Sequence, residues 1–291
     1  MTHETTRLAL PKGRMQAGVL ELMTAAGVRV DIGERRYRPS ISMAGFSAKL
    51  LKPQNVVEML HAGSRDVGFA GADWVEELDG TLVQLLDTGL DPVRVVAAAP
   101  ATLARSLVET GLEPGIPLTV ASEYRRLTSR WIEARGLAAT LVRSYGATEV
   151  FPPEDADVIV DNTATGATLE ANGLEIVDEL LSSSTRLYAN PRALDDARHR
   201  ERIENLVLVL ESVVEARRRV MLELNVDAGR LDDLVGILPC MRKPTVARLH
   251  GDEGYAIRVA VLREVLPALI PRVKARGGTD LVVTAPGQIV V

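Results

Sequence analysis

Residues 157–172 read D-V-I-V-D-N-T-A-T-G-A-T-L-E-A-N, a short apolar run followed by a loop of small residues. The run at 158–160 is typical of a buried strand, and Asp161 comes at its end. The loop of Thr, Ala and Gly lets backbone N–H groups approach an anion closely, while Asp161 can accept hydrogen bonds from sugar hydroxyls. The stretch therefore has the chemistry needed to hold a ribose 5-phosphate at the end of a strand.

The loop itself, residues 165–168, admits two interpretations. In the first, several N–H donors, the positive end of a short helix and the hydroxyls of Thr165 and Thr168 bind a phosphate. In the second, the same T-G-A-T segment is an ordinary glycine-containing turn with a capping threonine. The acidic residue just before the loop favours the first interpretation, because a carboxylate suits the diol of a ribose.

The chain before this stretch alternates apolar runs with helical patterns, which predicts a parallel sheet in an α/β fold. The run at 8–11 leads into the turn K-G-R at 12–14 and a helical pattern that stops at Gly27. Another helix is expected from Pro53, followed by a buried strand at 66–70. Lys12 and Arg14 could supply positive charge to a diphosphate or triphosphate, although each is equally well explained as a surface cation.

Gly71 and Asp73 follow the strand at 66–70, at the edge where parallel sheets usually bind ligands. Asp73 and Glu76 have the spacing of a capping box, so we expect a helix to begin there. Further strands are expected at 93–99, 118–121, 140–143, 158–161, 175–181 and 186–189, with a polar stretch before 118, a helix from Ser122 to Gly136, and an amphipathic helix through Ile203 and Val214.

The last 72 residues have a different order of strand and helix patterns, which predicts a ferredoxin-like βαββαβ domain. Its strands are expected at 220–226, 245–250, 255–262 and 280–284, with helices at 230–238 and before Gly277. Pro267 can occupy the opening turn of the second helix, whereas Pro271 should kink or delay that helix. The domain is similar to an appended sensor of small molecules.

Composition limits the partners. The 291 residues are 46% hydrophobic and 25% charged, and the net charge of -5 argues against a nucleic-acid partner. The single Cys240 has no partner for a disulfide and is expected to be a small core residue in a reducing compartment. Since the first residues lack an export pattern and no apolar run is long enough to cross a bilayer, we expect a cytoplasmic protein without a membrane partner.

Four segments together resemble the long form of the ATP phosphoribosyltransferase family, and the resemblance spans essentially the whole chain. They are L-A-L-P-K-G-R at 8–14, D-V-G-F-A-G-A-D at 66–73, T-V-A-S-E-Y-R-R-L at 119–127 and D-V-I-V-D-N-T-A-T-G-A-T-L-E-A-N-G-L at 157–174. The last is the most specific, because E-A-N-G-L followed by L-S-S-S-T-R-L is not needed for phosphate binding in general. Pro244 and Thr245, with the βαββαβ pattern, resemble the regulatory domain that short forms lack.

The resemblance implies two α/β lobes of the periplasmic-binding-protein type plus a C-terminal regulatory domain. Lobe I would comprise 1–92 and 185–217, lobe II 93–184, and the regulatory domain 218–291. The implied reaction joins N1 of ATP to C1 of phosphoribosyl pyrophosphate and releases pyrophosphate, with Mg²⁺ as counter-ion, in the first step of histidine biosynthesis. A dimer, and a hexamer assembled from dimers, are the implied oligomers; the metal ligands are not predicted.

The resemblance also implies roles for individual residues. Asp161 would hold the ribose hydroxyls, and Lys12 and Arg14 would face pyrophosphate or triphosphate. The proposed substrate-binding residues are Thr165, Gly166, Ala167 and Thr168 around the 5-phosphate, Gly71 and Asp73 in the cleft wall, Tyr124 near the cleft, and Glu149 as a contact to a ribose or the adenine amino group.

Feedback inhibition by histidine is implied for the C-terminal domain, with Asn225 and Thr245 as polar contacts and Met241 as an apolar wall. Asn225 stands where some relatives carry an acidic side chain. A neutral amide binds a cationic imidazole less strongly, so sensitivity to histidine is expected to be reduced unless Asp280 restores the charge.

Two other functions remain open from the residues. A salvage phosphoribosyltransferase uses a similar strand, acidic residue and T-G loop, but generally has two adjacent acidic residues where this chain has Asp161 and Asn162. A hinged small-molecule receptor would share the two-lobed architecture, yet the chain shows neither an export pattern nor a helix-turn-helix segment. The receptor would bind without turnover.

Overall fold

The computed structural model describes residues 5–33, 37–109, 117–251 and 253–291. These residues form two compact units, one comprising Met1–Glu21 with Val28–Asn205 and the other Leu22–Gly27 with Leu206–Val291. Helices α1 (Arg14–Ala25) and α8 (Ala197–Arg218) contain residues of both units. Among the described residues, no helix combines the length and apolar character that crossing a bilayer requires.

The first unit is built on one large sheet whose described strands follow the order β4-β1-β5-β10-β6-β9-β7-β8. The strands are β1 (Thr6–Pro11), β4 (Phe46–Leu51), β5 (Val67–Gly71), β6 (Val83–Pro100), β7 (Leu118–Ser122), β8 (Ala139–Arg143), β9 (Val158–Thr163) and β10 (Leu174–Ala189). Strands β2 (Val30–Asp31) and β3 (Ser40–Ile41) form a separate small ladder. The helices are α2 (Pro53–His61), α3 (Ala72–Glu77), α4 (Ala101–Glu109), α5 (Arg125–Arg135), α6 (Ala167–Ala171) and α7 (Pro191–Asp195), with a 3-10 turn η1 (Thr148–Val150).

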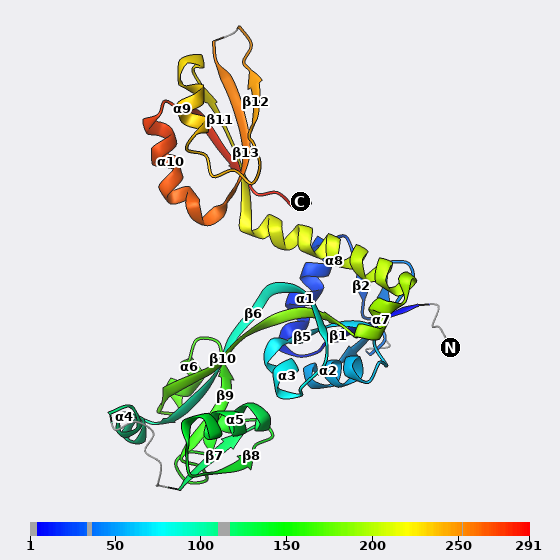
Figure 1. The fold of residues 1–291 in the computed structure, drawn as a ribbon, viewed down its shortest axis with the longest axis vertical. Coiled ribbons are helices and arrows are strands. Elements are labelled where there is room, and N and C mark those ends of the chain that lie inside the picture. Colours follow the sequence, from blue (N-terminus) through cyan, green and yellow to red (C-terminus); the bar gives the residue numbers. More distant parts are fainter. Residues whose placement is uncertain (1–4, 34–36, 110–116, 252) are drawn as a thin grey trace. The chain divides into compact units, whose positions relative to one another are not determined.

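Two long antiparallel strands, β6 and β10, divide this sheet into two α/β lobes (Figure 1). In lobe I, β1 pairs in parallel with β4 and β5, and β5 pairs with the end of β10. In lobe II, β7 pairs in parallel with β8 and β9, and β9 pairs with the second half of β6. The predicted two-lobed α/β class is confirmed, and the expected boundaries near 92 and 184 fall inside the two shared strands.

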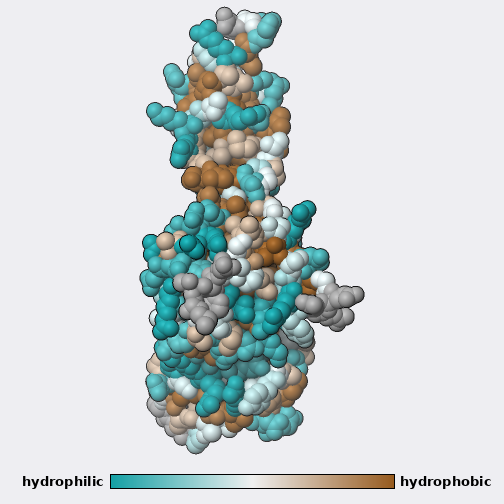
Figure 2. Space-filling view, turned by 90° about the vertical axis from the view of Figure 1, so that its right-hand side faces the viewer, coloured by the Kyte–Doolittle hydropathy of each residue, from teal (hydrophilic) through white to brown (hydrophobic). Residues whose placement is uncertain are grey.

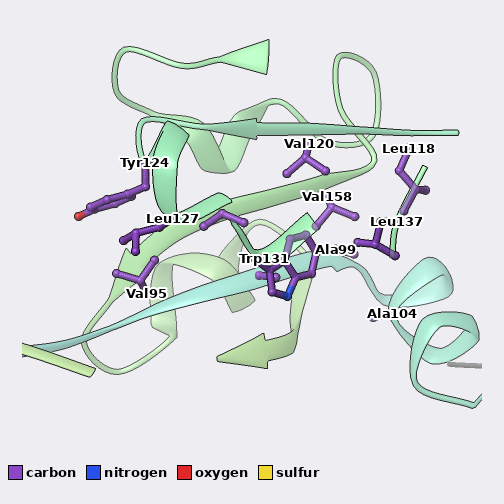
Figure 3. Close-up of a cluster of buried hydrophobic side chains, with 12 residues drawn as sticks. Val95, Ala99, Ala104, Leu118, Val120, Tyr124, Leu127, Trp131, Leu137 and Val158 are labelled. Carbon is purple, nitrogen blue, oxygen red and sulfur yellow. The ribbon is translucent and has the colours of Figure 1, made fainter. Parts of the chain in front are cut away.

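Each lobe has its own apolar core. The core of lobe I lies under α2 and includes Val56, Val57 and Leu60 packed against Ala9 and Ala70. The core of lobe II gathers side chains from β6, β7, β9 and α5 (Figure 3). In that view Tyr124 lies near Val95 and Leu127, and its hydroxyl points away from the apolar side chains. Packing of these small and branched residues on both faces fixes the strand ends that carry the polar groups.

Three local predictions were wrong. The polar stretch before 118 contains α4, whose Leu103 packs on the lobe II core, because an apolar stripe can form even in a short helix. The segments 175–181 and 186–189 are one strand, β10, which accommodates its polar middle through register shifts. Helix α3 begins after Gly71 without a side-chain cap, and Asp73 lies inside its first turn with its carboxylate buried.

The C-terminal domain has the predicted βαββαβ order, with its described strands arranged β12-β13-β11-β14. Its elements are β11 (Arg219–Val226), η2 (Ala228–Arg230), α9 (Leu231–Val235), β12 (Thr245–Arg248), β13 (Tyr255–Leu262), η3 (Arg263–Val265), α10 (Leu266–Ala275) and β14 (Thr279–Thr284). Alternate residues of β11 are buried under Leu234, Leu269 and Val273 of the two helices. The expected delay of this helix at Pro271 is wrong, since α10 begins at Leu266 and contains Pro271, at the cost of one backbone hydrogen bond.

The surface of the C-terminal domain carries apolar side chains. Figure 2 shows brown, apolar residues gathered on this domain, which is drawn at the top of the view. Val246 on β12, and Val282 and Val283 on β14, are exposed on the two outer strands of its sheet. Exposed apolar groups on edge strands favour contact with another protein surface.

Candidate active site

The carboxyl ends of the parallel strands carry several of the residues predicted for a site. In lobe I, Lys12 follows β1 and Gly71 ends β5. In lobe II, Glu123 follows β7, and Asp161 lies in the last half of β9. Parallel sheets bind ligands at this edge, where loops and helix N-termini converge.

One cavity brings together residues of both lobes and of the two shared strands. It is lined from lobe I by Lys12, Arg14, Met15, Pro53, Gly71, Asp73 and Trp74, from β6 and β10 by Asp91, Val93, Ser183, Ser184 and Thr185, and from lobe II by Tyr124 and Asn162. Five predicted site residues, Lys12, Arg14, Gly71, Asp73 and Tyr124, therefore line the same cavity. Asp161, Glu149 and the loop 165–168 are not part of this lining.

A buried hydrogen-bond network crosses the cavity. The Tyr124 hydroxyl donates to Asp73 Oδ2 at 2.7 Å, and Ser183 Oγ donates to Asp73 Oδ1 at 2.7 Å. Asn162 Nδ2 lies 3.0 Å from the Tyr124 hydroxyl and 3.2 Å from Asp161 Oδ1. Burial, together with the charge of Asp73, raises the pKa of Tyr124, so the phenol stays protonated and can act as the donor.

Asp161 is a carboxylate whose pKa lies well above its ordinary value. Burial, with smaller contributions from the charges of Glu123 and Glu149, raises the pKa of Asp161 to about 6, against the opposing effect of hydrogen bonds from Asn162 N–H and Thr148. The Asn162 N–H donates to Asp161 Oδ1 at 2.7 Å. Burial thus destabilises the ionised form of Asp161, and a ligand that donates hydrogen bonds to the carboxylate would stabilise it.

Glu149 lies in η1 and is half-buried. Its charge acts on Asp161, so the two carboxylates lie near each other; its predicted contact to a ribose or the adenine amino group stays a prediction. Thr148, next to it, is buried and its Oγ1 lies 2.8 Å from Ser144 Oγ. These hydroxyls fix the turn that carries Glu149.

The predicted phosphate loop is ordered by its own threonines. Gly166 N–H donates to Thr163 Oγ1 at 3.0 Å, and Ala167 N–H donates to Thr165 Oγ1 at 3.3 Å. Gly166 has φ +87°, a left-handed conformation, and no atom lies within 4 Å of the position a Cβ would take. The next residues begin α6, and Thr165, Ala167 and Thr168 are exposed to solvent. The loop is thus preformed, open, and joined to a helix N-terminus.

The basic side chains differ in their surroundings. Lys12 is half-buried, and its Nζ lies 4.0 Å from the centroid of the Tyr37 ring. Arg14 is exposed at the start of α1. The ring restrains the Lys12 ammonium without neutralising it, so the charge stays available to an anionic ligand.

Sequence reasoning missed a second cavity of the first unit. It lies between lobe I residues of α2 and α3 and lobe II residues at the ends of β7 and β8, including Lys52, Arg125, Arg143 and Tyr145. The Arg143 guanidinium lies 4.9 Å from the centroid of the Tyr145 ring. Lys52 and Arg143 stand at the ends of β4 and β8, so the rule that identified Lys12 could have found them too.

In the C-terminal domain, the predicted effector residues fall into two groups. Asn225 Nδ2 donates to Asp280 Oδ2 at 3.0 Å, and Thr279 Oγ1 lies 3.0 Å from the same oxygen. Thr245 lies on β12, and Asp280 lies on β14, the opposite outer strand of the sheet. The Met241 N–H donates to Ala260 O on β13, the strand next to β12. The structure therefore brings Asn225 and Asp280 together but does not bring Thr245 to Asp280.

The arrangement in the first unit is typical of a class of α/β enzymes. A small-residue loop that begins a helix, next to a strand-end carboxylate and near a cavity with two basic side chains, is found in transferases that act on phosphorylated substrates. The ATP phosphoribosyltransferase family model matches residues 52–212, and the model described as the C-terminal domain of HisG matches residues 216–285. The chain belongs to the ATP phosphoribosyltransferase family.

Individual relatives agree with this assignment over nearly the full chain. The ATP phosphoribosyltransferase of Chlorobium luteolum is 35% identical over 285 residues, which cover 96% of each chain. That of Pelotomaculum thermopropionicum is 33% identical and covers 95% of this chain and 96% of its own. A solved ATP phosphoribosyl transferase (HisG:HisZ) complex from Thermotoga maritima has a chain that is 28% identical, with a TM-score of 0.63 over 73% of this chain and 99% of that one.

Proposed function

We propose that the protein transfers the phosphoribosyl group of phosphoribosyl pyrophosphate to N1 of ATP and releases pyrophosphate, the first step of histidine biosynthesis. The observation that carries this proposal is the preformed loop at 163–168 beside Asp161, in a chain that belongs to this family over almost its whole length. The bond from N1 to C1 forms as the bond from C1 to the pyrophosphate oxygen breaks. Positive charge develops on the ribose as this happens. The enzyme therefore has to align the two substrates and stabilise the departing pyrophosphate anion, and it needs no covalent nucleophile.

The residues divide this work between the lobes. In lobe II, the amides and hydroxyls of 165–168 would bind the 5-phosphate, and Asp161 would accept from the ribose hydroxyls. In lobe I, Lys12 and Arg14 would stabilise the charge on the pyrophosphate or triphosphate. Glu149 would contact a ribose or the adenine amino group from η1, and Gly71 and Asp73 would form the wall of the cavity.

Mg²⁺ would act as a counter-ion of the phosphates. Among the described residues there is no group of three or more His, Cys, Asp or Glu side chains arranged to hold a metal ion. Mg²⁺ commonly binds at phosphate sites mainly through substrate phosphates and water, with one or two carboxylates. The ion would neutralise the departing pyrophosphate.

The direct test is turnover. The protein is mixed with ATP, phosphoribosyl pyrophosphate and Mg²⁺, and pyrophosphate is measured together with the mass of the nucleotide product. We expect equal amounts of pyrophosphate and of ATP carrying one phosphoribosyl group. Release of pyrophosphate with a free purine or pyrimidine base but not with ATP would instead establish a salvage enzyme, and binding without any release would establish a receptor.

The salvage alternative is not favoured by the structure of the carboxylate region. A salvage site generally uses two adjacent acidic residues, whereas here the second position is Asn162, whose amide donates to Tyr124 and Asp161. A second carboxylate at this position would remove the amide donor to Tyr124 and Asp161 and place another negative charge beside Asp161. The receptor alternative lacks a specific observation in its support.

Lys12→Met tests the lobe I cation. Methionine keeps an unbranched side chain against the Tyr37 ring but removes the charge that would face the diphosphate. We expect kcat/KM for phosphoribosyl pyrophosphate to fall about tenfold, since a charge-assisted contact is worth roughly 1.5–3 kcal/mol. The loss should shrink as salt is added, because screening weakens the wild-type contact. Lys274→Met, at an exposed position of α10, is the matched control. It should change neither kcat/KM for phosphoribosyl pyrophosphate nor the dependence of kcat/KM on salt.

Feedback inhibition by histidine is proposed for the C-terminal domain, centred on Asn225 and Asp280. The carboxylate of Asp280 can bind the ammonium or imidazolium of histidine, while the Asn225 amide already occupies one of its oxygens. Thr245 and Met241 would contribute only from the other side of the sheet. Regulation through this domain is supported by its presence in the chain and by the matched C-terminal family model.

Asn225→Asp and Asp280→Asn test this regulation in opposite directions. The first places two carboxylates side by side, which favours a bound cation, so inhibition should require about tenfold less histidine. The second removes the charge, while asparagine still tolerates the left-handed φ of +51° at this position, so inhibition should weaken strongly. Pyrophosphate release is followed during histidine titration, with Asp233→Asn on α9 as the control. Equal histidine sensitivity in the wild-type protein and all three variants would contradict the effector site.

Self-association is proposed as well, to a dimer and further to a hexamer. Its support is the set of exposed valines on the outer strands β12 and β14. Sedimentation velocity with and without histidine would measure the assembly, and a monomer under all conditions would contradict it. A cytoplasmic location is proposed from the biosynthetic role alone.

A further inference from the structure

We propose that Tyr124 and Asn162 are positioning residues that hold the ribose-binding carboxylate of Asp161 in place by linking it to Asp73 in the opposite lobe. The inference rests on the proposed function of Asp161. It assigns Tyr124 a role different from contact with the substrate. In this account, the ribose site of lobe II is complete only when lobe I is in contact with it.

The link is a chain of hydrogen bonds with a defined direction. Asp73 and Asp161 are carboxylates at its two ends and can only accept. The Tyr124 hydroxyl donates its single proton to Asp73 Oδ2 at 2.7 Å, so its oxygen must accept from Asn162 Nδ2 at 3.0 Å. The second proton of the same amide then points to Asp161 Oδ1 at 3.2 Å. Every group has one possible role, which fixes the orientation of the Asn162 amide.

Further hydrogen bonds fix the groups of this link in both lobes. In lobe I, Asp73 accepts from Ser183 Oγ at 2.7 Å, and its own N–H donates back to Ser183 Oγ at 3.0 Å. In lobe II, Tyr124 N–H donates to Ser122 Oγ, which itself donates to Val160 O on the strand that carries Asp161. The phenol therefore has little freedom to move relative to either lobe, and Tyr124 is 0% exposed.

Tyr124 also contacts lobe I through its ring. The ring stacks on Trp74 of α3 with 4.8 Å between centroids and an interplanar angle of 28°. The ring edge completes the lobe II core, as Figure 3 shows, while the hydroxyl leaves it toward Asp73. Removal of the hydroxyl alone can therefore separate the hydrogen-bond link from the packing.

A second contact between the lobes provides a control. The Glu77 carboxylate on α3 accepts from the amides of Arg126 at 2.9 Å and Leu127 at 3.0 Å at the start of α5. This contact also joins lobe I to lobe II, but its carboxylate bonds to the start of α5 and is no part of the chain to Asp161. If Tyr124 served only to hold the lobes together, Glu77→Gln should reproduce the effect of removing its hydroxyl.

The experiment compares Tyr124→Phe, Asn162→Ala, their double variant and Glu77→Gln. Binding of phosphoribosyl pyrophosphate with Mg²⁺ is measured by isothermal titration, and KM and kcat by pyrophosphate release. We expect Tyr124→Phe and Asn162→Ala each to weaken binding about tenfold, with the KM for ATP changed less than threefold, because each removes two of the three hydrogen bonds that link Asp73 to Asp161, and both remove the bond between Asn162 and Tyr124. Since the two residues act in series, the double variant should bind about as weakly as either single variant.

Two readouts separate this role from a loss of structure. Trp74 fluorescence, recorded in a Trp131→Phe background, should be unchanged in Tyr124→Phe, because the stacked ring remains. The pH dependence of kcat/KM for phosphoribosyl pyrophosphate should shift in Tyr124→Phe and Asn162→Ala but not in Glu77→Gln, since only the first two alter the surroundings of Asp161, Glu123 and Glu149.

Additive losses in the double variant, or a wild-type affinity in Tyr124→Phe, would overturn the inference. An effect of Glu77→Gln equal to that of Tyr124→Phe on both affinity and pH profile would do the same. Failure of the proposed function has a different signature. In that case the wild-type protein would release no pyrophosphate with ATP. The affinities of the four variants for phosphoribosyl pyrophosphate would still test the hydrogen-bond link.

Discussion

Gly166→Val should reduce kcat/KM for phosphoribosyl pyrophosphate by at least about 100-fold while the protein stays folded. Gly166 has φ +87° and open space around its missing Cβ, so the fold has room for the new side chain. A β-branched residue resists this conformation, at a cost of roughly 1–3 kcal/mol, and shifts the loop amides or occupies the space of the phosphate. Misplacement of a bound group by about 1 Å already costs about 100-fold in rate.

The matched control is Gly136→Val. Gly136 ends α5 with φ +64°, and it too has no atom within 4 Å of the position a Cβ would take, so backbone strain and space are comparable. This variant should lose a similar amount of thermal stability but keep the affinity for phosphoribosyl pyrophosphate. Affinity is measured by titration calorimetry and stability by thermal unfolding. Unchanged affinity in Gly166→Val would reject the phosphate assignment.

Asp161→Asn should lower kcat/KM for phosphoribosyl pyrophosphate by about 100-fold and at the same time stabilise the protein at pH 7. The loss follows because an amide replaces the carboxylate proposed to accept from the ribose hydroxyls, and charged hydrogen bonds are worth about 1.5–3 kcal/mol each. The gain follows because the folded protein keeps the Asp161 carboxylate at a pKa of about 6, above its ordinary value of 3.8. Ionising this group at neutral pH therefore costs folding free energy of about 3 kcal/mol.

The pH dependence gives the sign of both effects. Because the folded state binds this proton more tightly than the unfolded chain, Asp161 contributes stability below pH 3.8 and loses it as the pH rises through about 6. The stability advantage of Asp161→Asn should thus be small at pH 4 and largest above pH 7. Chemical denaturation across this pH range would measure the stability difference between the wild-type protein and Asp161→Asn. Wild-type kcat/KM should fall below pH 6, where the carboxylate is protonated.

Asp157→Asn is the control at the other end of the same strand. Asp157 Oδ2 accepts from Thr119 N–H at 2.7 Å just before β9 begins, away from the loop. Its substitution should destabilise the protein and leave kcat/KM for phosphoribosyl pyrophosphate unchanged. Opposite signs of stability change in the two variants would support the assignment, whereas a loss of stability in Asp161→Asn would contradict it.

Much of the candidate site follows from local sequence patterns. The apolar run at 158–160 and the small residues after it predicted a strand, a loop and a short helix, which the structure has as β9, residues 164–166 and α6. The position of Lys12 after β1 and Gly71 after β5 followed from the same alternation. Such patterns are local, since the side chains that decide them are a few residues apart.

The roles of Asp73 and Tyr124 could not be predicted in this way. Asp73 had the spacing of a helix cap, yet its carboxylate is bound by Tyr124, 51 residues away, and by Ser183, 110 residues away. Asn162 was recognised only as the missing second acid of a salvage enzyme. Its amide bridges Tyr124 and Asp161, which no spacing within residues 157–172 indicates.

The residue patterns by themselves determined the α/β class, the βαββαβ order of the C-terminal domain and the loop that begins α6, and the resemblance to a known family added the two lobes. Only the tertiary structure decided that β6 and β10 are shared by both lobes, that Tyr124 bonds across to Asp73, and that the pKa of Asp161 rises to about 6. The physical reason is that strand and turn formation depend on neighbouring residues. Burial and the convergence of Glu123, Glu149 and Asp161 depend instead on which distant strands the core packs together.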